Sequence, residues 1–411
     1  MKIVIFGLTV SSSWGNGHAT LWRGLCRALA RRGHFVSFFE RDVAYYAAHR
    51  DLLELPGGQL QLYSDWQQNL PAARRQLADA DAAMVTSYCP DGIAATDLVL
   101  ESPVPVRVFY DLDTPVTLDR LRAGEPLSYI GPQGLSGFDL VLSFTGGSAL
   151  EALHRELGAR RAAPLYGSVD PDIHRPVPAV ENYRADLSYL GTYAEDRQAA
   201  LNALFIKPAR KLPQQRFLIG GAQYPEKFPW TRNIFFVRHL PPGEHPGFYC
   251  SSSLTLNITR RAMAEMGYCP SGRLFEAAAC GTPLLSDWWE GLEEFFTPGS
   301  EILVARDTAE AIAALQCSDG QLSKIARAAR ERTLDEHTAD CRARELEAAL
   351  QGALRDGVAQ VSKPAVSPTS ESAALRTTPA PPSDRAPAGL ETCATGHRAA
   401  RPTSPPAESR Q

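Results

Sequence analysis

The chain has 411 residues, of which 44% are hydrophobic and 21% are charged, and its formal net charge is -4. This length exceeds what one hydrophobic core normally serves, so we expect two domains of ordinary size. The charges are mixed and form no basic stripe that would neutralise a nucleic acid backbone, which argues against nucleic acid as a partner. The eight cysteines show no spacing typical of a zinc site, and we expect free thiols in a reducing compartment.

The first element in the chain is the apolar run in MKIVIFGLTV. It is too short for a signal peptide or a transmembrane segment, so we interpret it as a buried strand and expect a cytoplasmic protein. Similar apolar runs then alternate with stretches of helical spacing, which is typical of βα units around a parallel sheet. The clearest helix spans residues 19–32. The strands predicted in the first half are residues 3–6, 35–39, 60–63, 83–86, 106–110, 140–144 and 164–166.

A segment with three prolines, residues 167–183, separates this series from a second one. The second series ends in a helix predicted over residues 321–354. The sequence therefore predicts an α/β protein with two Rossmann-like domains, and open α/β sheets bind ligands at the carboxyl ends of their strands, here in an interdomain cleft. The strands predicted in the second half are residues 187–190, 216–219, 234–237, 254–257, 284–286 and 302–304.

The domain boundaries follow from these runs. We predict a first domain at residues 1–180, a second domain at residues 181–355, and a C-terminal tail at residues 356–411. From residue 362 onward the chain is rich in Pro, Ser and Ala and has no aromatic residue. Such a composition buries too little apolar surface to offset chain entropy, so we expect the tail to be disordered.

The loop after the first strand, GLTVSSSWGNGHAT, is rich in serine and glycine. Gly15, Asn16 and Gly17 resemble the start of a dinucleotide-binding fingerprint, and Glu40 ends the second strand where a ribose-binding acid would lie. However, the glycines come eight residues after the strand, and the third glycine is missing. The pattern therefore argues against a nicotinamide-dependent dehydrogenase.

The same loop places His18 at the start of a helix. A histidine there can act as a general base on a hydroxyl, since its ordinary pKa is close to working pH, or it can simply cap the helix. Glu40 and its charged neighbours can likewise contact a substrate or form a structural ion-pair cluster. The sequence leaves both alternatives open.

The most informative segment of the second half is PSGRLFEAAACGTPLLSD, residues 270–287. Ser271 is a good helix N-cap, and a helix N-terminus with Arg273 beside it suits a diphosphate. Glu276, one turn later, is placed to accept hydrogen bonds from a sugar diol such as a ribose. The alternative is that Arg273 and Glu276 form an ordinary surface pair three residues apart.

This segment lies within LNITRRAMAEMGYCPSGRLFEAAACGTPLLSDWWEGLEEFFTPGSEILVA, residues 256–305, which resembles glycosyltransferases of the two-domain GT-B fold. It is most similar to the CgeB-type group, named for a spore maturation protein. The stretches SSSWGNGHAT, FFERDVAYYAAHRDL, VFYDLDTP and SYLGTYAEDRQ resemble the same group. The resemblance covers about residues 1–350.

The resemblance implies that the second domain holds a nucleotide-diphospho sugar and that the first holds the acceptor, with sugar transfer across the cleft. It implies a ribose-binding role for Glu276 and a phosphate-side role for Arg273 and Ser271. No cofactor beyond the donor is expected. The remaining residues that it implicates are Gly191, Thr192 and Tyr193 on the donor side, and Gly15, Gly17 and His18 on the opposite wall.

Asp111 and Asp113 resemble the DxD metal motif of the other large glycosyltransferase fold. That fold has a single mixed domain, so we expect no metal here. Either aspartate can orient an acceptor hydroxyl or act as its base, and either can instead cap the turn before Pro115.

One position departs from the broader GT-B pattern. Tyr268 stands where retaining members usually carry a second glutamate, eight positions before Glu276, and Glu265 is out of register. Retention or inversion is therefore left open. A non-catalytic binding or assembly protein and a nucleotide-sugar epimerase remain as alternative functions. The donor sugar is not identified, nor is the acceptor, which can be a glycan, a protein or a small molecule.

Overall fold

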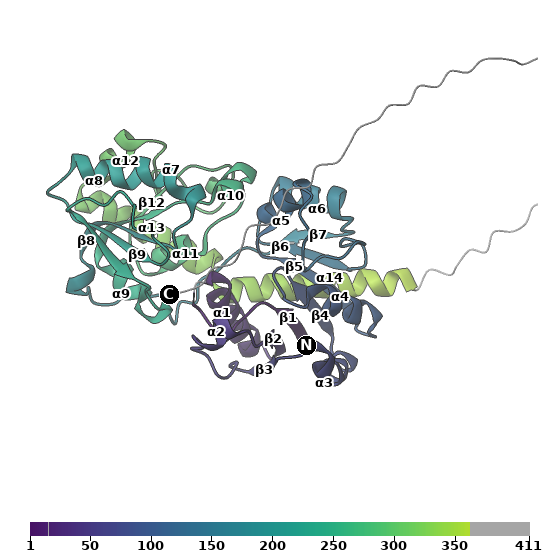
Figure 1. Ribbon diagram of the computed structural model, residues 1–411. Coiled ribbons are helices and arrows are strands. Elements are labelled where there is room, and N and C mark those ends of the chain that lie inside the picture. The colour runs from purple at the N-terminus through teal and green to yellow at the C-terminus, as the bar shows by residue number, and fades with distance from the viewer. Residues whose placement is uncertain (15, 362–411) are drawn as a thin grey trace, which may run out of the picture. The chain divides into compact units, whose positions relative to one another are not determined.

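The computed structural model describes residues 1–14 and 16–361 (Figure 1). Gly15 and residues 362–411, which hold most of the predicted tail, lie outside the described residues. The last helix continues to Val361, a few residues past the predicted start of the tail at residue 356. No proline interrupts the chain between the start of this helix and Pro364, so the helix can extend beyond the predicted boundary.

The first half of the chain forms a seven-stranded sheet in the order β3-β2-β1-β4-β5-β6-β7. All neighbouring strands are parallel. Buried clusters of hydrophobic residues pack on its strands, and β4 is buried along its whole length, as expected for a parallel sheet between helices. The strands are β1 (Lys2–Gly7), β2 (Phe35–Arg41), β3 (Gly58–Tyr63), β4 (Ala82–Thr86), β5 (Val106–Asp111), β6 (Leu140–Ser143) and β7 (Ala162–Pro164).

The second half forms a six-stranded parallel sheet in the order β10-β9-β8-β11-β12-β13. It has its own buried clusters of hydrophobic residues. Both sheets have the strand order of a Rossmann-like fold, so the predicted fold class is confirmed. The strands are β8 (Ala185–Leu190), β9 (Phe217–Gly221), β10 (Ile234–Arg238), β11 (Ser252–Asn257), β12 (Leu284–Ser286) and β13 (Leu303–Val304).

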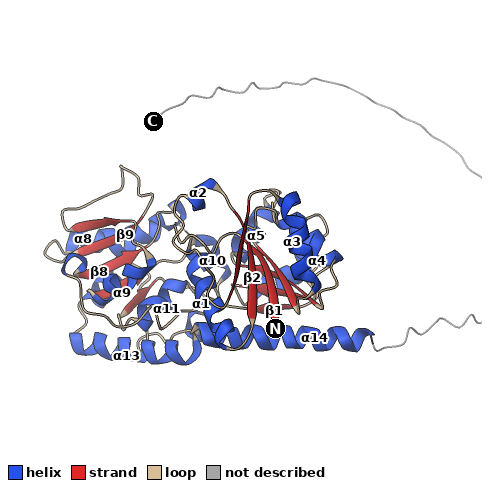
Figure 2. Ribbon diagram, turned by 90° about the horizontal axis from the view of Figure 1, so that it is seen from below, coloured by secondary structure: helices blue, strands red, loops and turns tan. Residues whose placement is uncertain are grey.

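Helices connect the strands and cover the sheets (Figure 2). In the first half they are α1 (Gly17–Arg31), α2 (Ala44–Ala47), α3 (Trp66–Ala78), α4 (Gly92–Glu101), α5 (Thr114–Arg122) and α6 (Ser148–Leu157). In the second half they are α7 (Gln198–Leu201), α8 (Lys207–Lys211), α9 (His245–Cys250), α10 (Arg261–Met266), α11 (Gly272–Ala279), α12 (Thr308–Leu315), α13 (Asp319–Glu336) and α14 (Ala339–Val361). Short helical turns are η1 (Glu181–Tyr183), η2 (Glu195–Arg197), the π-helical η3 (Asn202–Ile206), η4 (Pro242–Glu244) and η5 (Leu292–Glu294).

The single helix predicted over residues 321–354 is wrong, because the chain breaks between α13 and α14. At the break, the N–H of Val169 donates to the carbonyl of His337, and the N–H of Ala339 donates to the carbonyl of Val169. Val169 of the linker thus bonds to the backbone on both sides of the break. It replaces the hydrogen-bond partners that these backbone groups would find within a continuous helix. Arg342 adds a bond from its Nε to the carbonyl of Gly167 at 3.2 Å.

Helix α14 packs against α1 and the first sheet, although the predicted boundary at residue 355 assigns it to the second domain (Figures 1 and 2). Its buried apolar side chains share one cluster with residues of β1, α1 and β5. The chain therefore crosses between the two sheets twice, and the second domain ends before α14. The buried residues of this face are Ala339, Ala343, Leu346, Leu350 and Ala353.

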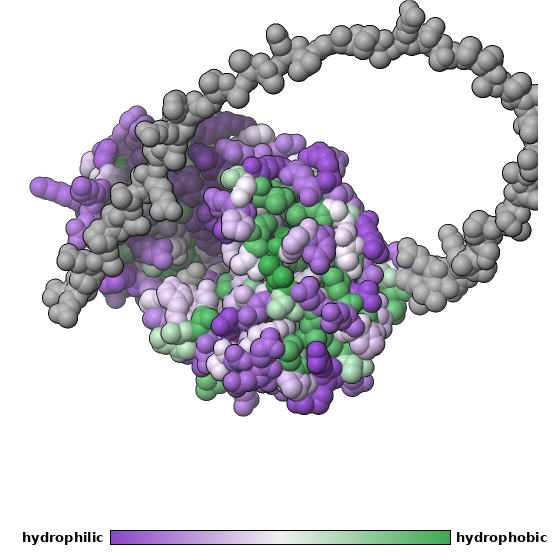
Figure 3. Space-filling model, turned by 45° about the vertical axis from the view of Figure 1, so that its right-hand side comes forward, coloured by the Kyte–Doolittle hydropathy of each residue, from purple (hydrophilic) through white to green (hydrophobic). Residues whose placement is uncertain are grey.

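The surface seen in Figure 3 carries hydrophobic residues interspersed among hydrophilic ones. Within residues 1–14 and 16–361, no helix has both the length and the apolar character needed to cross a membrane.

Candidate functional site

Each sheet has one point where the strand order reverses direction, between β1 and β4 in the first and between β8 and β11 in the second. In open α/β sheets, ligands bind outside the carboxyl ends of the strands at such points. The loops that follow β1, β8 and β11, together with the starts of helices α1 and α11, contain most of the residues that the sequence singled out.

The loop after β1 is held by Glu40, the sixth residue of β2. Its carboxylate accepts hydrogen bonds from the hydroxyls of Thr9 and Ser11 at 2.7 and 2.6 Å, and from the N–H groups of Val10 and Ser11 at 2.8 and 2.9 Å. Glu40 is 1% exposed. It forms no ion pair with the described residues, and its four hydrogen bonds fix the shape of this loop.

The loop ends at Asn16, which is the N-cap of α1. Its side-chain oxygen accepts the N–H of His18 at 3.1 Å, so Asn16 does the capping, and the imidazole of His18 is free for another role. Gly17 has no other atom near the position of a Cβ, so it borders open space.

His18 and Asp113, two of the predicted catalytic residues, lie together. The Nε2 atom of His18 is 3.3 Å from Oδ2 of Asp113, and both side chains are about four-fifths buried. The Nδ1 atom of His18 has no partner among the described residues. A carboxylate beside one ring nitrogen orients a histidine and stabilises its protonated form, which leaves the other nitrogen to exchange a proton.

Asp111 is 0% exposed and, unlike Asp113, forms no ion pair with His18. Its Oδ1 accepts the N–H of Asp113 and the hydroxyl of Thr117, both at 3.1 Å. Burial raises its pKa from 3.8 to about 6. The structure favours the turn-forming alternative for Asp111, because its Oδ1 is bonded to groups of its own turn.

The loop after β8 holds the predicted donor-side residues Gly191, Thr192 and Tyr193. A Cβ on Gly191 would come within 2.6 Å of Nη1 of Arg273, so a larger residue here would displace this guanidinium group. Arg273 donates from Nη1 to the carbonyl of Leu190 at 2.6 Å. The N–H of Tyr193 bonds to the carbonyl of Ala222, which ties the loop to the end of β9.

Ser271 is the N-cap residue of α11, as predicted, but its hydroxyl accepts no helix N–H. It accepts Nε of Arg273 at 3.2 Å. Arg273 is thus fixed at both the Nε and the Nη1 side, and the first N–H groups of α11 keep no side-chain cap. Arg273 and Glu276 form no ion pair with each other, so the alternative of a surface pair is not found.

Arg197 lies near enough to both Arg273 and Arg260 to be influenced by their charges, and we call these three residues the arginine cluster. The pKa of Arg197 is lowered, first by burial and then by the charges of Arg273 and Arg260. Arg197 bonds through Nη1 to the carbonyl of Thr192 at 3.3 Å, and its buried Nε has no partner. Asp196 pairs with Arg260 at 3.2 Å, but among the described residues no carboxylate forms a salt bridge with Arg197 or Arg273.

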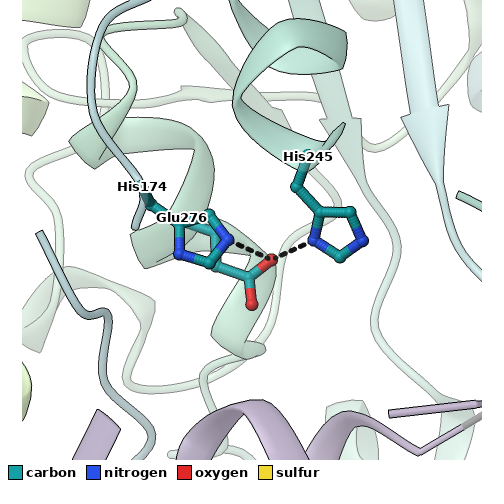
Figure 4. Close-up of side chains that lie close together, drawn as sticks. All are labelled: His174, His245 and Glu276. Atoms are coloured by element: carbon teal, nitrogen blue, oxygen red, sulfur yellow. Dashed lines mark ion pairs between the residues drawn. The ribbon is translucent and has the colours of Figure 1, made fainter. Parts of the chain in front are cut away.

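Glu276 points from α11 toward two histidines (Figure 4). Its Oε2 lies 3.9 Å from Nε2 of His174 in the linker and 3.5 Å from Nδ1 of His245 at the start of α9. The hydroxyl of Tyr249 donates to the same oxygen at 3.4 Å. Burial raises the pKa of Glu276, but His174, His245 and Arg273 lower it to about 2, so the carboxylate is ionised.

Side chains from the two halves meet on the side of these loops. The ring of Trp14 packs against that of His239, which follows β10, with ring centroids 3.9 Å apart and ring planes tilted by 40°. Tyr88 follows β4; burial and then the charge of Asp113 raise the pKa of its hydroxyl, while Arg260 acts in the opposite direction. The loops after β1 and β4 thus lie beside residues of the second half, Arg260 of the arginine cluster among them.

Tyr268 joins the two halves at another point. Its carbonyl accepts the N–H of Gly146, which follows β6, at 2.9 Å. Its ring packs where a Cβ on Gly147 would collide with it. Glu265, the nearest acid in sequence, is exposed and pairs with Arg261, so it does not replace the expected glutamate.

The sequence did not single out Arg197, Arg260, His174 or His245. Arg197 and Arg260 do lie in stretches that resemble the GT-B group, but the chain contains 42 lysines and arginines, and nothing in their spacing distinguishes these two. His174 lies in the proline-rich linker, about a hundred residues from Glu276, and only the fold brings them together.

Comparisons with known proteins agree with this geometry. A family described as "Glycosyl transferase-like" matches residues 197–348. The structure is similar to sucrose-phosphate synthase from Thermosynechococcus elongatus, with 14% identity, a TM-score of 0.62, and coverage of 88% of this chain and 100% of that one. It is also similar to Anabaena HepE in complex with UDP and glucose, with 11% identity, a TM-score of 0.60, and coverage of 86% and 100%.

A third similar structure is an alpha-glucosyltransferase in complex with UDP and DNA, with 12% identity, a TM-score of 0.60, and coverage of 85% of this chain and 99% of that one. No curated protein matches the chain. At these identities the structural similarities establish the fold, which is that of two Rossmann-like domains in the GT-B arrangement. The family match adds a glycosyl transferase-like region that runs from η2 through β9 to β13 and into α14.

Proposed function

We propose that the protein is a glycosyltransferase that moves a sugar from a nucleotide-diphospho sugar to an acceptor hydroxyl without a metal ion. The family match, the fold and the resemblance to the CgeB-type group support this class of activity. The observation that carries the proposal is the arginine cluster at the carboxyl ends of the second sheet.

The arginine cluster suits the diphosphate of the donor. Three guanidinium groups gather beside one ion-paired carboxylate, and the buried Nε of Arg197 lacks a partner. Bringing like charges together and leaving a buried donor unpaired are both costly, unless an anion binds there. The cluster would stabilise the charge that builds on the leaving diphosphate, a task that a metal performs in other enzymes.

Glu276 suits the ribose of the same nucleotide. Its Oε2 faces the histidines and Tyr249, whereas its Oε1 forms no hydrogen bond with the described residues. An ionised carboxylate with a free oxygen accepts hydrogen bonds from a diol. Glu276 lies one turn after Arg273 on α11, which fits the spacing of a ribose and its diphosphate.

His18 and Asp113 suit the acceptor. The ring nitrogen of His18 that faces away from Asp113 accepts the proton of the attacking hydroxyl, and the carboxylate of Asp113 stabilises the imidazolium that results. The proposal therefore divides the work between the halves, with the leaving group on the second sheet and the acceptor on the first.

Donor binding tests the proposal, with isothermal titration calorimetry of UDP and a panel of nucleotide sugars. UDP is the first probe, because HepE and the alpha-glucosyltransferase were solved with it. We expect Arg260→Ala to lower affinity about tenfold or more, since it removes a charged contact to phosphate. The matched control is Arg261→Ala, which removes the neighbouring arginine from an exposed pair and should leave affinity unchanged.

Turnover separates the alternative functions. Release of nucleotide that needs an acceptor supports transfer, whereas a changed sugar without acceptor indicates an epimerase. Nucleotide binding without turnover indicates a non-catalytic protein. The proposal is refuted if no nucleotide sugar binds, or if Arg260→Ala and Arg261→Ala bind equally well.

A further inference from the structure

The cluster of His174, His245 and Glu276 contains more than a ribose-binding carboxylate requires. The three side chains come from three segments, namely the linker, the start of α9 and the second turn of α11 (Figure 4). One ligand atom from each lies within 4.8 Å of the other two. His174 is 1% exposed, and neither of its ring nitrogens has a hydrogen-bond partner.

The hydrogen bonding of His245 fixes which of its nitrogens carries a proton. Its Nε2 lies 3.3 Å from the carbonyl of Leu240, and a carbonyl can only accept, so Nε2 donates. In the neutral ring, Nδ1 therefore presents a lone pair, and it faces the Oε2 of Glu276 at 3.5 Å. Two acceptors that face each other require a cation between them.

A proton or a metal ion can be that cation, and His174 distinguishes them. A proton on His245 satisfies one contact and leaves His174 buried without a partner. A single metal ion would contact one ligand atom from each of the three groups, and of the two buried nitrogens of His174 it would leave one without a partner. Metal-binding histidines usually donate their second nitrogen to a carbonyl or carboxylate, as His245 does to Leu240.

The distances fit a small divalent ion. Ligands about 2.1 Å from a tetrahedral Zn²⁺ are separated from each other by about 3.4 Å. The Oε2 atom of Glu276 is 3.5 Å from Nδ1 of His245 and 3.9 Å from Nε2 of His174, and the ligand atoms of the two histidines lie within 4.8 Å of each other. Closing all three separations to tetrahedral spacing would take combined side-chain shifts of at most about 1.4 Å for any pair. Two imidazoles and one carboxylate are ligands that suit Zn²⁺ and similar ions, and they leave a coordination position open.

We propose that His174, His245 and Glu276 bind one divalent transition-metal ion of the Zn²⁺ class, and that this ion opposes donor binding. The opposition rests on the proposed function of Glu276, since a carboxylate bound to a metal is a weaker acceptor for a ribose diol. Metal binding itself does not depend on that function. The ion takes no part in the transfer step.

The linker gives the site a connection to the first half of the chain. His174 ends a turn in which its N–H bonds to the carbonyl of Asp170 at 2.9 Å. Asp170 in turn accepts Nε of Arg27 in α1 at 2.7 Å. An ion on His174 would therefore tie the linker to α9 and α11. Because the linker also bonds to α1, the ion would connect the proposed donor side to the first half of the chain.

The first experiment is a titration of the chelator-treated full chain with Co²⁺, followed by visible absorption, and with Zn²⁺, followed by calorimetry. We expect one ion per chain and the absorption of a tetrahedral site. His245→Gln and Glu276→Gln should each weaken binding at least about tenfold. His154→Gln, which changes an exposed histidine of α6, is the matched control and should bind normally. Circular dichroism verifies that the variants are folded, and Glu276→Gln preserves side-chain volume if another variant is unstable.

The second experiment measures UDP affinity with and without Zn²⁺. Wild type should lose affinity when Zn²⁺ is present, whereas His245→Gln should not, and the variant corrects for complexes between Zn²⁺ and UDP in solution. Absence of stoichiometric metal binding, or equal binding in His245→Gln and wild type, overturns the site. Metal binding with unchanged UDP affinity overturns the opposition alone. Metal binding without any UDP affinity refutes the proposed function and leaves the site standing.

Discussion

Asp111 should make the stability of the protein depend on pH in a way that one substitution removes. The carboxyl group is fully buried at the end of β5, and burial raises its pKa from 3.8 to about 6. Because the folded-state pKa is raised, the stabilising contribution of this group is complete below about pH 4 and is lost as the pH rises through about 6. Once ionised, Asp111 costs about 3 kcal/mol relative to its protonated form.

The substitution is Asp111→Asn, which keeps the shape of the side chain and cannot ionise. An oxygen remains available for the N–H of Asp113 and the hydroxyl of Thr117. Between about pH 5 and pH 8 the linkage relation gives a loss of about 1.4 kcal/mol for wild type that the variant does not share. The free energy of unfolding of the variant should thus gain on that of wild type as the pH rises.

Urea unfolding followed by circular dichroism, at several pH values in this range, measures the difference. The quantity of interest is how the difference in free energy of unfolding between the two proteins changes with pH. The substitution also places an amide where Oδ2 of Asp111 has no partner, but the cost of that amide does not vary with pH and so does not affect the change. Parallel pH profiles would refute the reasoning, since they would mean that Asp111 does not titrate there.

Three other substitutions test the roles assigned above. Arg342→Ala should lower the free energy of unfolding, measured by urea titration, by about 3 kcal/mol or more, because the carbonyls of Gly167 and Glu336 lose their buried partner. The control is Arg344→Ala, which changes an exposed residue and should cost under about 0.5 kcal/mol in the same titration. Glu40→Gln should cost about 3 kcal/mol by thermal or urea unfolding, because an amide faces N–H donors of the loop after β1; an unchanged midpoint would contradict its structural role. Tyr268→Glu should lower the melting temperature because it adds a negative charge beside several glutamates, and high salt should reduce this effect. The substitution should not improve donor turnover, and a gain in turnover would show that the protein lacks only the glutamate expected at this position.

The strands were predictable because a buried parallel strand is a short run of apolar residues, and each predicted run corresponds to a strand of the structure. The largest displacement is at β7, an edge strand of only three residues, Ala162–Pro164, where the apolar signal is weak. The break between α13 and α14 could not be predicted, because it depends on pairing with Val169, far away in the sequence. No glycine or proline marks it.

The candidate site was predictable where a local pattern fixes the geometry. Arg273 and Glu276 lie on one short helix, and the spacing alone places them one turn apart. The partners of those residues come from elsewhere in the chain: His245 lies thirty-one residues before Glu276, and Arg197 is held by the loop after β8. Their contribution depends on burial and on like charges brought together, neither of which a single sequence displays.

Tyr268 shows how the fold accounts for the departure from the GT-B pattern. Its backbone φ is +48°, an uncommon conformation for a residue with a side chain, and two glycines, Gly147 and Gly291, leave room for its ring. Burial and then the charges of Glu290 and its neighbouring glutamates raise the pKa of its hydroxyl, so this position already faces negative charge. A glutamate here would add to that charge and lose the packing against the first half. The position therefore joins the two halves, and the function proposed above assigns the stabilisation of the leaving diphosphate to the arginine cluster.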